Sequence, residues 1–174
     1  MVANTSGSAA TVSYDTTTGT TASTITTGAL SIASGSTSPI NYFVKTAGAG
    51  IISGAISVNG SIWLDNTYGC ASGPCTALTA TDGYITTSNY SSKATATAHG
   101  VLINGVLSAG TGLTIKGATY SANHGVYDNS YAISSATGDI NILGITNTGS
   151  GIWMQNGTPT VTASTGNIVM TGYQ

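Results

Sequence analysis

Residues 135–144 of this 174-residue chain read Ser-Ala-Thr-Gly-Asp-Ile-Asn-Ile-Leu-Gly, and residues 164–172 repeat the pattern as Ser-Thr-Gly-Asn-Ile-Val-Met-Thr-Gly. In both stretches a corner of small residues precedes apolar residues that lie two positions apart. A spacing of two puts side chains on the same face of a β-strand, whereas one face of an α-helix recurs every three to four positions. Each stretch therefore predicts a corner followed by a strand with one buried face.

Similar units recur along the chain at intervals of 26 to 29 residues. We take the anchors of these units to be Gly28, Gly54, Gly83, Thr111, Gly138 and Gly166. An aliphatic residue stands two positions after every anchor, which predicts one stacked core column of Leu30, Ile56, Ile85, Leu113, Ile140 and Ile168. Fixed repeats of this length are typical of solenoids, in which each repeat packs on its neighbours.

Two further columns predict two more strands in each repeat. One contains Leu78, Val106, Ile133 and Val161, and the other runs through Ile62, Val101, Val126 and Ile152. We therefore expect an all-β fold, a right-handed parallel β-helix of about six coils of roughly 27 residues, with three strands per coil. The β-helix is expected over residues 24–174. Residues 1–23 are expected to form a low-complexity segment that acts as a cap or an extra strand.

Details of the corners and loops also follow from the pattern. Six positions after the anchors the chain has mostly glycine or asparagine, including Gly117 and Gly144, which tolerate positive φ angles and so can turn a corner. Residues 68–75 and 88–99 do not fit the aligned strands, so we expect them to bulge outward as loops.

The chain carries very little charge. Charged residues make up 5% of it, with three Lys and five Asp, and the formal net charge is −2, against roughly 25% charged residues in an average domain. Such a surface is not expected to bind nucleic acid. No apolar run approaches the ~20 residues needed to cross a bilayer as a helix, so we expect no membrane span.

The two cysteines, Cys70 and Cys75, lie in the segment Gly-Cys-Ala-Ser-Gly-Pro-Cys. Gly and Pro turn the chain back on itself, which favours a disulfide within a loop and a location outside the cytoplasm. The alternative is a pair of free thiols. Two cysteines alone are too few ligands for a metal site.

The motifs at residues 135–144 and 164–172 resemble the passenger regions of filamentous-haemagglutinin-type exoproteins and autotransporter adhesins. The resemblance implies a right-handed β-helix, secretion across an outer membrane and a role at the bacterial cell surface. The secretion domains of that family carry Asn-Pro signatures, but none of Pro39, Pro74 and Pro159 follows an Asn. The chain therefore resembles the shaft of such a protein and not its export module.

This interpretation predicts a structural or adhesive segment of a secreted cell-surface protein or an extracellular filament. The expected partners are further coils of a longer chain, a second copy attached head to tail, or a host or matrix glycan. An enzyme and a bound cofactor are not expected, because the chain has no Arg and no Glu and its Asp residues do not share an offset from the anchors.

Four kinds of side chain are candidates for a binding role. His99 and His124 align on neighbouring coils, where they are either a two-His metal pair or, as we favour, plain corner residues. Asn66, Asn104, Asn129 and Asn156 are interpreted as a structural ladder. Trp63, Tyr127 and Trp153 are candidates for stacking on a glycan. Thr-x-Thr rows such as Thr24-Ile25-Thr26 favour an alternative ice-binding function only if they stack on one flat face.

Replacing Cys70 and Cys75 together by Ser should lower the melting temperature only slightly. A disulfide that closes so short a ring removes little entropy from the unfolded chain. Thermal unfolding followed by circular dichroism measures the shift. Loss of folding in the double variant would show that the loop is integral to the core.

Overall fold

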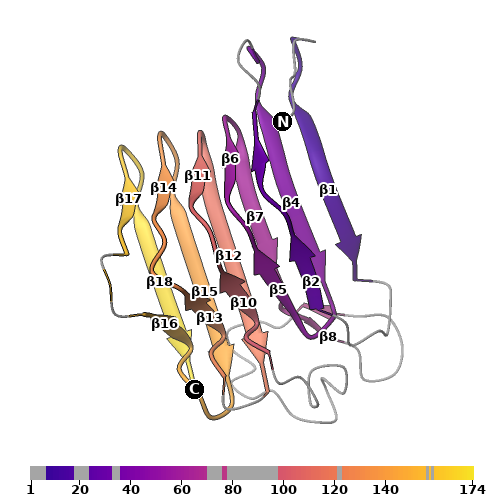
Figure 1. Cartoon of the computed structure of the whole chain (residues 1–174), viewed down its shortest axis with the longest axis vertical. Coiled ribbons are helices and arrows are strands. Elements are labelled where there is room, and N and C mark those ends of the chain that lie inside the picture. The colour runs from indigo at the N-terminus through magenta and orange to yellow at the C-terminus, as the bar shows by residue number, and fades with distance from the viewer. Residues whose placement is uncertain are drawn as a thin grey trace.

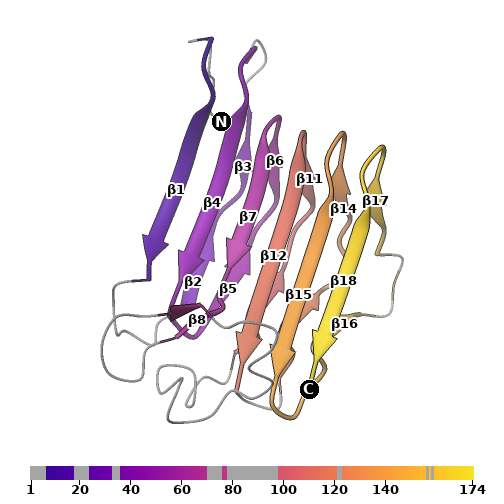
Figure 2. The ribbon, with the colours of Figure 1, turned by 180° about the vertical axis from the view of Figure 1, so that it is seen from behind.

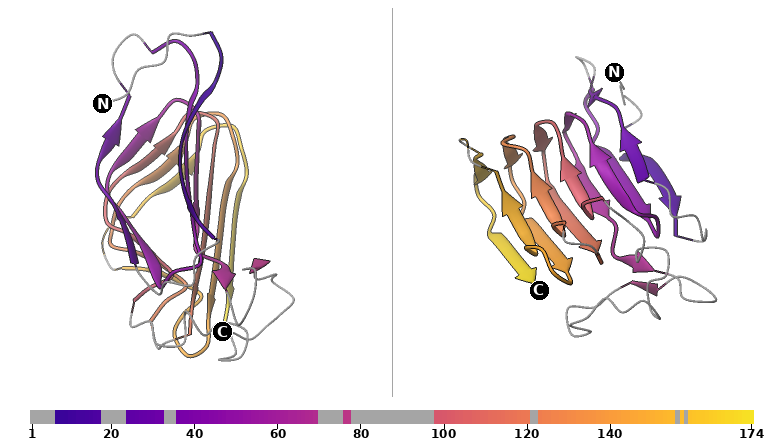
Figure 3. Two further views of the ribbon diagram at one scale, coloured as in Figure 1. Left: turned by 90° about the vertical axis from the view of Figure 1, so that its right-hand side faces the viewer. Right: turned by 60° about the horizontal axis from the view of Figure 1, so that its bottom comes forward.

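Parallel strands of three sheets wind around one apolar core. The computed structural model describes residues 7–17, 24–32, 36–69, 76–77, 98–120, 123–155, 157 and 159–174. Within these ranges the fold is an all-β parallel solenoid without helices (Figure 1). Strands of successive coils overlay one another when the molecule is viewed from the side (Figure 3, left). The predicted fold class is confirmed at this level.

Each sheet is built from strands of successive coils (Figure 2). The first sheet contains β1 (Ala10–Thr16), β4 (Ile40–Thr46), β7 (Ser61–Asp65), β12 (Gly112–Thr119), β15 (Ile140–Thr146) and β18 (Ile168–Tyr173). The second contains β2 (Thr24–Thr27), β5 (Gly50–Ser53), β10 (Val101–Ile103), β13 (Val126–Asp128) and β16 (Ile152–Met154). The third contains β3 (Leu30–Ser31), β6 (Ile56–Val58), β11 (Leu107–Ala109), β14 (Ile133–Ser135) and β17 (Val161–Ala163).

The prediction of six coils of 27 residues is wrong, because the solenoid makes about four turns. From β10 onward, residues paired in register on successive coils are 25 to 28 positions apart, but Ser61 and Thr111, which are hydrogen-bonded, are 50 positions apart. Ile56 pairs directly with Leu107. No coil therefore lies between β6 and β11, although the interval from Gly54 to Thr111 is long enough for two repeats.

β8 (Tyr68–Gly69) and β9 (Thr76–Ala77) lie within this interval and pair antiparallel. Residues 70–75, which include both cysteines, lie outside the described residues, and so does Ile85. The disulfide and the place of Ile85 in the core therefore stay predictions.

The expected single core column is also corrected, because its members belong to two sheets. Leu30 and Ile56 lie on the third sheet in register with Leu107, Ile133 and Val161. Leu113, Ile140 and Ile168 lie on the first sheet, in one column with Val12, Tyr42 and Ile62. Similar corner sequences precede the strands of both sheets. The anchor residue therefore predicts where a strand begins but not which sheet the strand joins.

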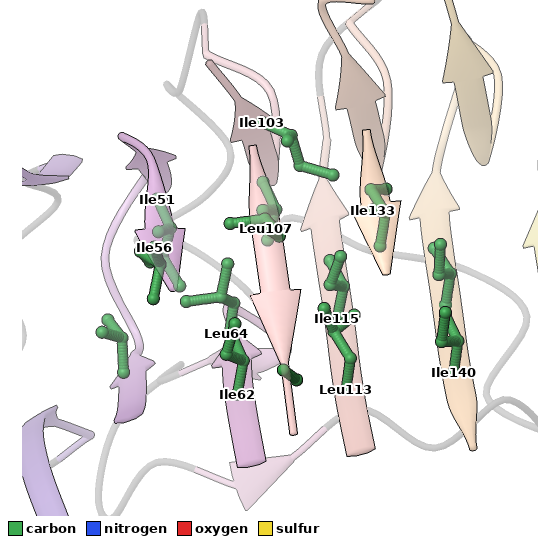
Figure 4. Packing of buried hydrophobic residues seen from close by; sticks show 14 of the residues in the cluster. Ile51, Ile56, Ile62, Leu64, Ile103, Leu107, Leu113, Ile115, Ile133 and Ile140 are labelled. Atoms are coloured by element: carbon green, nitrogen blue, oxygen red, sulfur yellow. The ribbon is translucent and has the colours of Figure 1, made fainter. Parts of the chain in front are cut away.

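Alternation along the strands fills the interior with aliphatic side chains (Figure 4). On β12, for example, Leu113 and Ile115 are buried while Thr114 and Lys116 between them are partly exposed. The core also draws Ile51 and Ile103 from the second sheet and Ile133 from the third. Burial of these side chains is the main favourable term for folding, at about 25 cal/mol per Å² of apolar surface.

Glycines at the corners allow the backbones of neighbouring coils to approach each other closely. A Cβ on Gly138 would lie 1.6 Å from the carbonyl oxygen of Thr111 on the preceding coil. Gly117 and Gly144 do not use their tolerance of positive φ, since the glycines with positive φ among the described residues are Gly7 and Gly112. The corners therefore need glycine for its missing side chain more than for its conformational freedom.

The last coil exposes residues whose counterparts are buried one coil earlier. Ile168 is 44% and Met170 40% exposed, whereas Ile140 and Ile142, their partners in the ladder, are 0% and 2% exposed. At the opposite end of the first sheet, β1 pairs with β4 over its whole length and leaves Tyr14 54% exposed. Among the described residues, β1 and β18 thus pair on one side only and form open edges of the first sheet (Figure 1).

Shortening two side chains of the same column, one buried and one at the open edge, should show how much each position contributes to stability. Ile140→Ala removes a fully buried side chain and should cost about 2–5 kcal/mol of unfolding free energy. Ile168→Ala, in the same column, should cost about 1 kcal/mol because its side chain is already half in solvent. Urea denaturation measures both losses. Equal losses would mean that something covers Ile168 in solution.

Candidate functional site

The best-defined cluster of chemically distinctive side chains is an aromatic ladder, which comprises His99, His124, Tyr127 and Trp153. His99 and His124 occupy the corners before β10 and β13, while Tyr127 and Trp153 point outward from β13 and β16. Ring centroids are 5.4 Å apart for His99 and His124, 4.4 Å for His99 and Tyr127, and 5.1 Å for His124 and Trp153. The planes of these pairs differ by 11° to 17°.

Each imidazole also accepts a backbone hydrogen bond from the next coil. The amide of His124 donates to Nδ1 of His99 at 3.2 Å, and the amide of Ser150 donates to Nδ1 of His124 at 3.1 Å. An amide N–H can only donate, so both Nδ1 atoms carry lone pairs and the proton of each neutral ring lies on Nε2. The histidines are therefore parts of the ladder between coils.

Burial lowers the pKa of both histidines. The pKa of His99 falls mainly through desolvation, and the neighbouring His124 lowers it further. Desolvation is also the main cause of the lowered pKa of His124. Both rings are consequently neutral near pH 7.

The stacking limits any contact with a glycan. Carbohydrates bind aromatic rings through their faces, but the rings of the aromatic ladder turn their faces toward one another. Trp153, which is 45% exposed, is the last ring of the ladder. It is therefore the member best placed to offer a ring face to a ligand.

Trp63 belongs to a different site from Tyr127 and Trp153. It lies on β7 in the first sheet, with the ammonium groups of Lys45 and Lys116 at 6.0 Å and 5.1 Å from its ring centroid. Phe43 meets it edge-on at a centroid distance of 6.4 Å. The three predicted glycan-stacking residues thus do not form one platform.

The same sheet carries a row of alternating charges that the sequence did not reveal. In register along the outer face stand Asp15, Lys45, Asp65 and Lys116. Opposite charges side by side on neighbouring strands favour this register. Four of the eight charged residues in the chain lie in this one row.

The predicted Asn ladder is divided. The side-chain amide of Asn129 donates to Oδ1 of Asn104 at 3.0 Å, so these two residues form one step of a ladder. Asn66 is buried elsewhere, where its Nδ2 donates to the carbonyl of Gly48 at 3.0 Å. Asn156 lies outside the described residues.

Asp128 is a buried carboxyl that sequence analysis did not single out. It faces inward beside Tyr127, with no exposed surface. Its Oδ1 accepts the backbone amide of Tyr131 at 3.0 Å, while Oδ2 has no partner among the described residues. Desolvation raises the pKa of Asp128 above its usual value. Alternation along β13 could have shown the inward orientation.

The described residues do not assemble a cluster of metal ligands. Within these ranges no three His, Cys, Asp or Glu side chains come close enough to hold a metal ion. The Nδ1 atoms of His99 and His124 are already engaged by backbone amides. In the part of the chain that the structure describes, no helix is long and apolar enough to span a bilayer.

Among the described residues, the Thr24-Ile25-Thr26 row does not stack on a second threonine row. Thr24 and Thr26 on β2 pair with Gly50 and Ile52. Thr79, Thr81 and the Thr95-Ala96-Thr97 row lie outside the described residues. The third sheet instead presents a column of small hydroxyl residues, Ser31, Ser57, Ser108, Ser134 and Thr162. This column is one residue wide and mostly Ser.

Comparisons of the chain with protein-family models, curated proteins and solved structures found no match.

Replacing Asp128 by Asn should change how stability depends on pH. Because the pKa of Asp128 is raised in the folded state, its contribution is fully present below about pH 3.9 and is lost as pH rises through the folded pKa. The Asn variant should lack this loss. Urea denaturation between pH 3.5 and pH 7 checks the difference, and parallel curves for the two proteins would contradict it.

Proposed function

We propose that this chain is a structural, non-catalytic shaft segment of a secreted bacterial surface protein, wound as a right-handed β-helix, with an adhesive role. The observation that carries the proposal is the open edge of the last coil. Ile168 and Met170 continue two buried columns of the first sheet and remain 44% and 40% exposed. A further coil is the structure that would bury them, because it supplies both strand hydrogen bonds and apolar contacts.

The composition supports the same role. Uncharged residues such as Ser13, Asn41 and Thr114 occupy many outward strand positions, and the four charged residues of the first sheet alternate in sign along one row. A rigid rod of this kind presents a repeating polar surface over its whole length. The motifs at residues 135–144 and 164–172, which resemble those of filamentous-haemagglutinin-type exoproteins, support an extracellular location.

Adhesion in this proposal would use the outer face of the second sheet. Trp153 is exposed at the end of the aromatic ladder, and Tyr127 beside it donates a hydrogen bond from its hydroxyl to Gln155. An indole face flanked by a side-chain amide suits a glycan, since sugars combine apolar CH faces with hydroxyl groups. The expected partners are thus a glycan and further coils, from the same chain or from a second copy.

The open edge should make the isolated chain associate with itself. Sedimentation velocity from micromolar to millimolar protein should show a growing weight-average mass. Replacing Ile168 and Val169 by Lys should hold the protein as a monomer, because charges on an edge strand block further pairing. The proteins are compared at the same ionic strength.

A matched control adds the same two charges elsewhere. Ser57→Lys with Val106→Lys places them on exposed positions of two middle coils, and this variant should associate like the unmodified chain. A stable monomer of the unmodified chain at millimolar concentration would overturn the proposal. Equal loss of association in both double variants would do the same, since it would assign the effect to net charge.

A further inference from the structure

The two histidines accept hydrogen bonds from backbone amides of a neighbouring coil, a role that asparagine side chains have elsewhere in the solenoid. At two other steps a side-chain oxygen accepts a backbone amide from a neighbouring coil. Asn59 Oδ1 accepts the amide of Ile40 at 2.8 Å, and Asn41 Oδ1 accepts the amide of Ser61 at 2.9 Å. At the corner of the aromatic ladder the acceptors are instead Nδ1 of His99 and of His124. An amide oxygen does not titrate near neutral pH, but an imidazole does.

We propose that His99 and His124 form an acid-sensitive clamp, which ties the corners before β10, β13 and β16 together when the rings are neutral and releases them when the rings take up protons. This device goes beyond the proposed shaft function and does not depend on it.

Protonation is incompatible with the observed contacts for two reasons. The added proton must go to Nδ1, because Nε2 already carries one, and Nδ1 is where the backbone amide points. The ring then has no acceptor left, so the amides of His124 and Ser150 lose their partners. In addition, the two rings are stacked with centroids 5.4 Å apart, so two imidazolium charges would repel each other at short range.

The surroundings offer the charged rings little compensation. The titratable side chain that stacks on both imidazoles is the phenol of Tyr127 from β13, and β16 contributes the uncharged indole of Trp153. The carboxyl of Asp128 is turned into the core on the other side of β13. Desolvation, which is the main cause of the lowered pKa of each histidine, acts in the same direction.

The clamp predicts local opening below the ordinary pKa of histidine. A group whose pKa is depressed in the folded state stabilises that state fully above about pH 6.5 and loses the contribution as pH falls. Each histidine that gains its proton only on opening should raise the opening equilibrium about tenfold per pH unit.

Hydrogen exchange measured by NMR on the whole chain tests this between pH 7.5 and pH 5. After correction for intrinsic rates, protection of the His124 and Ser150 amides should fall steeply with acid. The amides of Ile40 and Ser61, which donate to Asn oxygens, are internal controls and should change little. Protection at the His124 and Ser150 amides that stays flat down to pH 5 would overturn the proposal.

A double variant, His99→Asn with His124→Asn, keeps an acceptor at each corner and removes the titration. Its protection at the same two amides should be independent of pH over this range. A loss as steep as in the unmodified chain would show that other groups cause it. Should the variant fold poorly, ¹⁵N shifts of the imidazoles in the unmodified chain decide the matter: Nδ1 should be the unprotonated nitrogen at pH 7.5, and a protonated Nδ1 would refute the clamp.

Discussion

The whole structure depends on the parallel hydrogen-bond ladder between successive coils. Each strand pairs with its counterparts on the coils before and after it, about 4.8 Å away, so equivalent residues are forced into contact. The residues of each column must therefore pack well on their own equivalents one coil above and one coil below. Inside the first sheet this requirement is met by a continuous aliphatic column that contains Ile62, Leu113 and Ile140.

The ladder imposes the same constraint on polar and aromatic columns. Like charges in one column would repel at every step, and the outer row of the first sheet instead alternates Asp15, Lys45, Asp65 and Lys116. Flat rings on neighbouring coils stack face to face, as His124 and Trp153 do with planes 11° apart. This stacking stabilises the coil, but it takes away ring faces that a ligand would need. Aromatic residues in a solenoid are therefore weaker signals of a binding platform than they are on a flat sheet.

The sequence allowed the fold class to be predicted, because alternation at 140–146 and 168–173 is local information that one strand carries by itself. The assignment of each strand to a sheet was predicted less accurately than the fold class. The corners before Ile56 and Ile140 look alike, yet one strand joins the third sheet and the other the first. The segment around Gly83 has nearly the length of a coil, so spacing alone counted it as one. At the candidate site, alignment of the repeats correctly placed His99 beside His124. The hydrogen bonds from backbone amides to their Nδ1 atoms could not be predicted, because they depend on the exact positions of the corners.

The second sheet joins two titratable systems that respond to acid in opposite directions. Asp128 favours the folded state more as pH falls, since its buried carboxyl is easier to hold when protonated. His99 and His124 favour it less, since their rings are held by contacts that need the neutral form. Both effects act between about pH 4 and pH 6.5, so they partly cancel in the global unfolding free energy. A flat pH profile of the unmodified protein would therefore not mean that these groups are inert. Their contributions separate only when one system is replaced, or when the measurement is made at single amides of the corner that the histidines hold.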